Sequence, residues 1–113
     1  MPQVTFSPSG NTFNVPFTTT ASNVSLGIQG TDLQTLFKID NSSGNLAFVT
    51  FSTSQATANA IAHPTAGTST NCIAVRTGAT TLVNPGLGIY NGPVYVGAIS
   101  VSGTGNIYIQ PGV

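Results

Sequence analysis

Residues 35–52 constrain the fold of this chain more than any other stretch. The first half alternates, with Phe37 and Ile39 on one face of an extended segment, which is the period-two pattern of a half-buried strand. Residues 41–45 (NSSGN) are of types that tolerate turn geometry. Residues 46–52 then form a second apolar segment. The stretch therefore predicts a β-hairpin.

The returning segment carries apolar side chains on both of its faces. Leu46 and Phe48 lie on one face, and Ala47, Val49 and Phe51 lie on the other. A strand with one face in water alternates apolar and polar residues instead. We therefore expect a second sheet on one side and a neighbouring segment or another subunit on the other, and this pattern favours assembly.

The end of the chain repeats the same design. Residues 94–101 are β-branched and apolar on both faces, residues 102–106 are turn formers, and residues 107–109 return. The turn and return SGTGNIYI matches SSGNLAFV of the first stretch in type and order. Two copies cannot make a repeat array, so we interpret them as two uses of one hairpin design.

Shorter segments complete the β pattern. Pro16 cannot donate to a ladder, so the strand that contains it is predicted at a sheet edge. Residues 32–35 fit one helical turn, and residues 56–62 fit either a short helix or a strand. We favour a strand for 56–62 because the neighbouring segments are β and no helical capping is evident. Further strands are predicted at 4–6, 12–18, 24–28, 71–76 and 80–83, with Val24, Leu26, Ile73 and Val75 facing inward.

The predicted fold class is all-β, an antiparallel β-sandwich that is jelly-roll-like, with about eight to ten short strands. The chain has 113 residues, which predicts a single β-sandwich domain over residues 1–113. Residues 1–9 are expected to form an N-terminal arm or an edge strand. A chain of this length folds without disulfides or metal, since it buries about two thirds of its unfolded surface.

Charge is scarce in this sequence. Charged residues make up 4% of the chain and the formal net charge is zero, whereas an average domain is about 25% charged. Nucleic-acid binding requires a Lys and Arg stripe, and an anionic membrane requires a polybasic patch, so neither partner is expected. A neutral chain also lacks the self-repulsion that keeps concentrated copies apart.

Other sequence features bear on disorder, redox state and targeting. Regularly spaced apolar residues, 40% of the chain, argue against disorder. The single cysteine, Cys72, excludes an intrachain disulfide and is expected to be a small buried hydrophobe. No basic segment followed by an apolar run opens the chain, so no signal peptide is expected.

Titratable groups are too few to predict a catalytic centre. The acids are Asp32 and Asp40, and the bases are Lys38, Arg76 and His63. Two carboxylates can flank a glycosidic bond, but a turn-capping role explains Asp40. No G-x-S-x-G nucleophile motif is present. We therefore expect no enzyme activity, no catalytic residue and no cofactor.

Metal and ligand motifs are equally sparse. Residues 40–45 place oxygen donors on alternate positions, as in a calcium loop, but carry one carboxylate and no glutamate. A turn explains them better, and His63 with Cys72 cannot assemble a zinc site within one chain, so no metal is expected. Gly103 and Gly105 are interpreted as hairpin residues, since no helix follows to cradle a phosphate.

Tyrosines are the remaining candidates for ligand contact. Tyr90, Tyr95 and Tyr108 are able to stack on sugars, although the chain lacks tryptophan. A sheet-packing or interface role is favoured for all of them. No binding residue is assigned from the sequence.

Two segments carry a family resemblance. The pattern FKIDNSSGNLAFVTF at 37–51 and YVGAISVSGTGNIYIQPG at 95–112 resembles small virion-associated structural proteins of tailed phages, some of which are capsid decoration or cement proteins. The loop at 84–93 departs from the shorter connection expected and suggests adaptation to a partner. The resemblance transfers no catalytic residues.

The resemblance implies a virion structural protein, most simply a capsid decoration or cement protein on the capsid surface, made in the host cytoplasm. Its expected partners are copies of itself, with a trimer as the expected oligomer, and the major capsid protein or other virion proteins. Two alternatives stay open. One is a head–tail adaptor or tail component, and the other is a module that binds host glycans through Tyr90 and Tyr95 beside Asn91.

Overall fold

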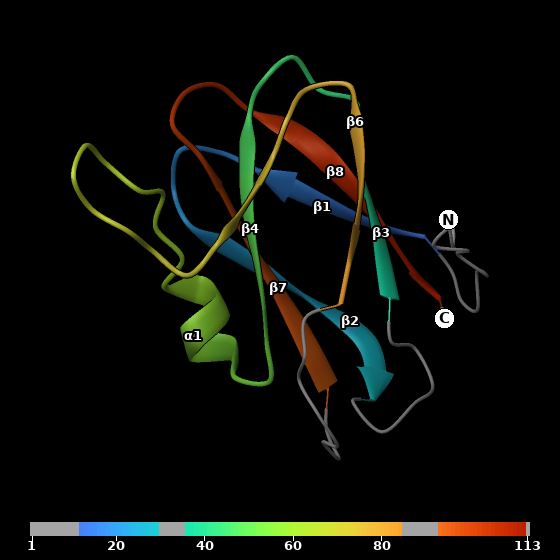
Figure 1. Cartoon of the computed structure of the whole chain (residues 1–113). Coiled ribbons are helices and arrows are strands. Elements are labelled where there is room, and N and C mark those ends of the chain that lie inside the picture. Colours follow the sequence, from blue (N-terminus) through green and yellow to red (C-terminus); the bar gives the residue numbers. More distant parts are fainter. Residues whose placement is uncertain (1–11, 30–35, 85–92, 113) are drawn as a thin grey trace, which may run out of the picture.

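Two four-stranded antiparallel sheets pack face to face in the computed structural model, which describes residues 12–29, 36–84 and 93–112 (Figure 1). Sheet A has the order β1 (Phe13–Phe17), β8 (Gly105–Gly112), β3 (Leu36–Asn41), β6 (Ala79–Val83). Sheet B has the order β2 (Ser22–Gln29), β7 (Pro93–Ser100), β4 (Ala47–Ser52), β5 (Ile73–Val75). The predicted antiparallel β-sandwich is confirmed.

The strand order is that of a jelly roll. Among the described strands, only β4 and β5 follow one another within the same sheet, and every other consecutive pair is divided between sheets A and B. Eight strands in two sheets with this order form the double Greek key of jelly-roll domains. Strand β1 lies at the edge of sheet A, so the edge position predicted from Pro16 is confirmed.

Both predicted hairpins are wrong. In residues 35–52, β3 lies in sheet A and β4 in sheet B, and in residues 94–109, β7 lies in sheet B and β8 in sheet A. Each turn carries the chain from one sheet across to the other. Alternation and turn residues predict strand, turn and strand, but they do not say whether the second strand pairs with the first or faces it. Here the strands face each other, and the rings of Phe37 and Phe51 meet across the interior with their centroids 4.9 Å apart.

These two crossings, arch 1 (residues 42–46) and arch 2 (residues 101–104), lie against each other. Strand β3 pairs with β8, and β4 pairs with β7, so the arches are stacked at one end of the sandwich. Asn45 Nδ2 donates to the Thr104 carbonyl oxygen at 2.9 Å. Gly103 has φ of 76°, and a Cβ there would be 2.5 Å from the Asn45 side chain. The repeated sequence thus encodes one crossing used twice.

The core fills the space between the sheets. The inward residues of alternating strands are buried, which confirms the predicted inward faces at Phe37, Ile39, Leu26 and Val75, with Val24 and Ile73 packed at the margin. Strand β4 contributes its Ala47, Val49 and Phe51 face. The main core consists of Val15, Phe17, Leu26, Phe37, Ile39, Ala47, Val49, Phe51, Val75, Val94, Val96, Ala98, Ile107 and Ile109.

A helix lies where a strand was predicted. Helix α1 spans Gln55–Asn59, so the strand favoured for 56–62 is wrong. Ser54 supplies the N-cap, because its side chain accepts a hydrogen bond from the Thr57 backbone amide at 3.3 Å. A capping serine in a Ser- and Thr-rich segment carries little signal in the sequence, since the same residues also fill loops.

The helix covers the outer face of sheet B. Phe48, Ile61 and Ile99 are buried together in a second cluster, and Figure 1 shows α1 beside β4 and β7. The second apolar face of β4 is therefore covered, as expected, and the cover is a segment of the same chain rather than another subunit. Cys72 packs at the margin of this cluster and is half-buried rather than buried.

Several predictions lie outside the described residues. They are the strand at 4–6, the arm at 1–9, the helical turn at 32–35 and most of the loop at 84–93. Within the described part of the chain, no helix has the length and hydrophobicity to cross a bilayer.

Candidate functional site

The outer face of sheet A carries the polar site of the molecule. Because Phe37, Ile39 and Ile109 point inward, alternation directs the side chains of Lys38, Asp40 and Tyr108 outward. The described helix packs on strands of sheet B and not on this face. The outward side chains of sheet A are not covered by this helix, and Lys38 and Asp40 are partly exposed.

One row of polar side chains crosses all four strands of this face. Tyr108 of β8 is opposite Asn14 of β1 on one side and Asp40 of β3 on the other. Asp40 is in turn opposite Thr80 of β6. Neighbouring strands lie about 4.8 Å apart, so the row extends over about 14 Å. Residues from four separate parts of the sequence thus form one continuous surface.

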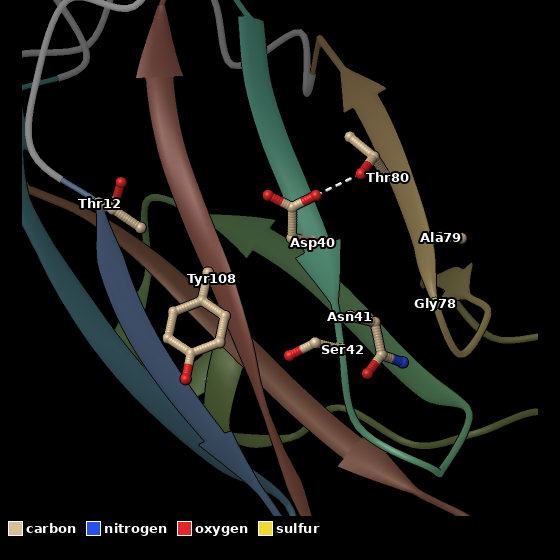
Figure 2. A pocket seen from close by; sticks show the side chains of 8 residues that line it. All are labelled: Thr12, Asp40, Asn41, Ser42, Gly78, Ala79, Thr80 and Tyr108. Atoms are coloured by element: carbon tan, nitrogen blue, oxygen red, sulfur yellow. Dashed lines mark hydrogen bonds between the residues drawn. The ribbon is translucent and has the colours of Figure 1, made fainter.

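A groove of about 490 Å³ follows this row (Figure 2). Its volume falls within the range of small-molecule sites, roughly 300–1,000 Å³. The full lining is Thr12, Asp40, Asn41, Ser42, Gly78, Ala79, Thr80 and Tyr108.

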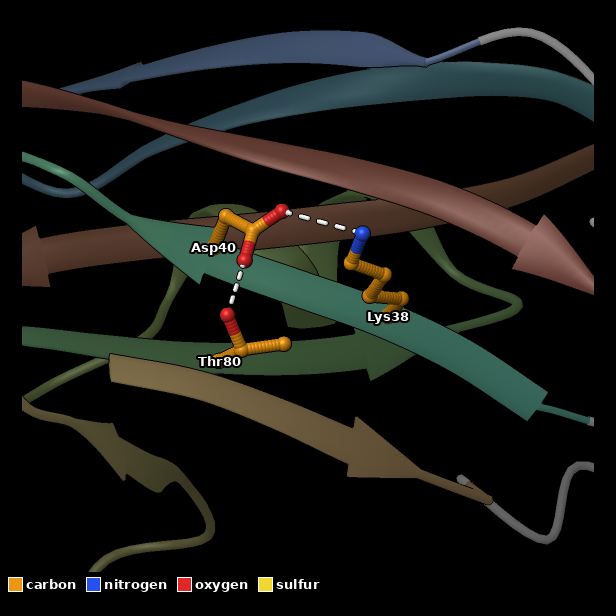
Figure 3. A network of polar contacts seen from close by, with 3 residues as sticks. All are labelled: Lys38, Asp40 and Thr80. Carbon is orange, nitrogen blue, oxygen red and sulfur yellow. Dashed lines mark hydrogen bonds and ion pairs between the residues drawn. The ribbon is translucent and has the colours of Figure 1, made fainter. Parts of the chain in front are cut away.

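Asp40 is held from two sides. The Thr80 hydroxyl donates a short hydrogen bond to Asp40 Oδ1, and Lys38 Nζ lies 3.7 Å from Asp40 Oδ2 (Figure 3). Lys38 and Asp40 are 39% and 38% exposed, so water screens the ion pair and leaves it worth little as a stabilising contact. The result is an oriented carboxylate in a groove whose local charge is balanced.

Asn41 was expected from the sequence to bond nearby backbone amides in the turn, but its burial and its bond to the other sheet were not predicted, and its role is structural. It is 1% exposed. Its Nδ2 donates to the carbonyl oxygens of Asn45 and Val75, both at 2.9 Å. Its Oδ1 accepts from the Ser43 amide at 3.1 Å and the Ser43 hydroxyl at 2.6 Å. The signal was its place in the alternation, because residue 41 follows Phe37 and Ile39 on the inward face, where an amide requires partners.

These bonds bear on the two interpretations of residues 40–45. The Asn41 side chain is turned inward and satisfied by protein groups, so it does not face an external ion. It joins β3 of sheet A to Val75 of β5 in sheet B. The predicted turn is confirmed at residues 43–45. The turn-capping role expected of Asp40 is not seen in these bonds, since Asp40 accepts from Thr80 of the neighbouring strand.

The other titratable candidates that the structure describes are not among the residues that line the groove. His63 stacks obliquely near Phe48, with ring centroids 6.2 Å apart, on the sheet B side. The Cys72 sulfur lies 3.2 Å from the Thr70 hydroxyl, and Arg76 is exposed in the turn before β6. Asp32 lies outside the described residues, so its pairing with Asp40 is not tested. Among the residues that the structure places, no three His, Cys, Asp or Glu side chains gather as metal ligands.

The two described tyrosines, Tyr95 and Tyr108, lie on different sheets. Tyr95 belongs to the outer face of sheet B, since its neighbours Val94 and Val96 are in the core, whereas Tyr108 lines the groove on sheet A. Tyr90 and Asn91 are outside the described residues. The glycan site expected around Tyr90 and Tyr95 is therefore not tested, and Tyr108 is the described tyrosine that lines the groove.

Comparisons with family models, with curated proteins and with solved structures found no match for this chain.

Proposed function

We propose that this chain is a structural component of a phage particle, a capsid decoration or cement protein that assembles with copies of itself and with the major capsid protein. The resemblance at residues 37–51 and 95–112 supports this role. The jelly roll is an architecture that capsid proteins share with lectins, although a shared architecture alone does not assign a function. The near absence of charge suits a surface that packs against many copies of itself.

The observation that carries the proposal is an exposed apolar pair at the arch end of the sandwich. Leu46 is 39% exposed and Val101 is 57% exposed. Leu46 immediately precedes Ala47, Val101 immediately follows Ser100, and Ala47 pairs with Ser100. The two exposed side chains therefore lie at the same end of sheet B, where a second copy of the chain would bury both.

Each such contact is weak, and an assembly is stabilised by the sum of many of them. Burial of apolar surface contributes about 25 cal/mol per Å², so two side chains give a weak contact. Repetition over a shell raises the effective affinity, because each bound copy brings the next contact within reach. This mechanism needs neither a charged patch nor a catalytic group.

Solution mass measured by light scattering behind a sizing column tests the proposal. We expect an oligomer, with a trimer as the expected size, and we expect Leu46→Ser and Val101→Ser to shift it toward monomer. Leu82→Ser is the matched control, because Leu82 is 38% exposed on sheet A and should leave the mass unchanged. Co-sedimentation with empty capsids of the same virus is the second test.

A monomer that also fails to bind capsids would refute the proposal. A monomer that binds capsids through the arch end would mean that the copies assemble on the capsid and not before they bind it. Labelling of intact particles separates the alternatives within the virion, since a head–tail adaptor or tail component labels at one vertex or on the tail rather than over the shell.

A further inference from the structure

We infer that the groove on the outer face of sheet A is a binding site for an uncharged saccharide. The inference rests on the register of sheet A and on the chemistry of the groove, and it does not depend on a role in a virus particle. It also differs in place from the site expected around Tyr90 and Tyr95, which involves the opposite sheet.

Charge selects the class of ligand first. The groove contains the Asp40 carboxylate, which disfavours a phosphate, sulfate or other anion. Lys38 lies beside that carboxylate and partly balances its charge. A single carboxylate that is paired in this way is also a poor site for a divalent cation, which prefers several oxygen ligands with more charge. An uncharged ligand remains.

The polar groups then require a ligand rich in hydroxyls. A carboxylate offers about four acceptor positions, and Thr80 and Lys38 occupy only part of that capacity. Thr12, Ser42 and Thr80 add hydroxyls that donate or accept. A sugar presents adjacent hydroxyls that donate to a carboxylate and accept from a serine or threonine, which an apolar ligand cannot do.

Tyr108 supplies the apolar component. Its ring is half-buried beside Asp40 in the groove (Figure 2). An aromatic side chain with a polar tip packs against the C–H face of a sugar ring while its hydroxyl stays in water. The row from Asn14 to Thr80 extends the same polar surface across the sheet, so a short oligosaccharide fits better than a single sugar.

The carboxylate is already oriented before a ligand arrives. Thr80 holds one Asp40 oxygen from the neighbouring strand, and Lys38 lies against the other. Both partners are anchored on strands rather than on loops. Preorganisation of this kind lowers the entropy lost when the ligand binds.

The test is an array of uncharged and charged oligosaccharides, followed by titration calorimetry with the strongest uncharged ligand. We expect binding to uncharged glycans. Asp40→Asn should weaken it about tenfold or more, because a hydrogen bond to a charged group is lost. Tyr108→Ala should weaken it by a similar factor through loss of stacking, and Thr80→Val by less.

Tyr95→Ala is the discriminating variant, because it removes the half-buried tyrosine of the alternative glycan site on the other sheet. It should bind as the original chain does, and thermal melting checks that each variant is folded. A loss of glycan binding in folded Tyr95→Ala would place the site on that sheet and overturn the inference. Absence of binding to every uncharged glycan, preference for sialylated or sulfated glycans, or unchanged affinity in folded Asp40→Asn would each overturn the inference. These outcomes leave the arch-end proposal unaffected, because Leu46 and Val101 are not part of the groove.

Discussion

The two outer faces of the sandwich differ in whether a described segment covers them. The face of sheet B continues the apolar interior, since Phe48 and Ile99 are buried beneath the segment that contains α1 and Ile61. The face of sheet A is bare of such a cover in the described chain and carries Lys38 and Asp40 at the surface. Within the described chain, the outer face of sheet B extends the core, and the outer face of sheet A presents polar side chains.

A single glycine explains how the helix reaches sheet B. Gly97 lies on β7 directly under α1, and a Cβ at this position would be 2.1 Å from the Ala58 carbonyl oxygen. Ala58 is itself fully buried. The backbone of the helix therefore rests on the backbone of the strand, and Asn23 adds a hydrogen bond from its Nδ2 to Asn59 Oδ1 at 3.1 Å.

The largest loss of stability should come from Phe48→Ala, on the covered face of sheet B. Phe48 is 8% exposed and forms the centre of the covered face, so we expect a loss of about 3 kcal/mol in the free energy of unfolding. Urea denaturation measures it. Leu82→Ala, on the bare face, should change stability by about 0.5 kcal/mol or less. Equal effects at the two positions would mean that the helix does not cover sheet B.

The next largest effect should come from Gly97→Ala. The added methyl group collides with backbone rather than with a flexible side chain, so α1 must move away from the sheet. We expect a loss of about 2 kcal/mol in the free energy of unfolding and greater exposure of Cys72 to thiol reagents, because Cys72 packs against the same cluster. Gly44→Ala is the control, since a Cβ there meets nothing within 4 Å.

Removal of the helix cap should have a smaller effect. Ser54→Ala removes the acceptor for the Thr57 amide, and we expect a loss of about 1 kcal/mol. Ser54→Asp should retain most of the stability, because aspartate also caps helices. Thermal or urea denaturation of both variants checks this, and equal losses in the two would argue that Ser54 acts through something other than the cap.

The sequence predicted the layers of this fold better than their connections. Strict alternation at Phe37 and Ile39 identifies the inward face whatever the strand pairs with, and Pro16 identifies an edge because it lacks an amide proton. Pairing depends on contacts between distant segments. Arch 1 looks like a hairpin turn until β7 and β8 are known to form a matching arch beside it.

The groove could not be predicted from the sequence either, because it depends on which distant strands pair. Asp40 was recognised as a carboxylate at a turn, and Tyr108 as a possible sugar platform, but no pattern in the sequence places them side by side. The β3–β8 register makes Asp40 and Tyr108 opposite residues, and the β3–β6 register brings Thr80 to the other side of Asp40. These registers come from packing of the whole sandwich.

The smallest expected effect on stability comes from a substitution of Lys38, which tests whether the charged pair on sheet A stabilises the fold. Lys38→Met retains the length of the side chain and removes its charge. The Lys38–Asp40 pair is exposed and lies at 3.7 Å, so we expect the free energy of unfolding to change by about 0.5 kcal/mol or less, measured by urea denaturation.

That small value matters because the fold then provides no reason for an acid and a base to lie together on the outer face of sheet A, whose described strands carry no other charged side chain. A loss of about 2 kcal/mol or more would give the pair a structural purpose and weaken the argument for a ligand. A salt titration gives the same information. Screening at about 1 M salt reduces the contribution of the exposed Lys38–Asp40 pair to the free energy of unfolding. Two results would together assign Lys38 and Asp40 to binding rather than to folding. The free energy of unfolding of the original chain would not change with salt, and the glycan affinity would fall in Asp40→Asn.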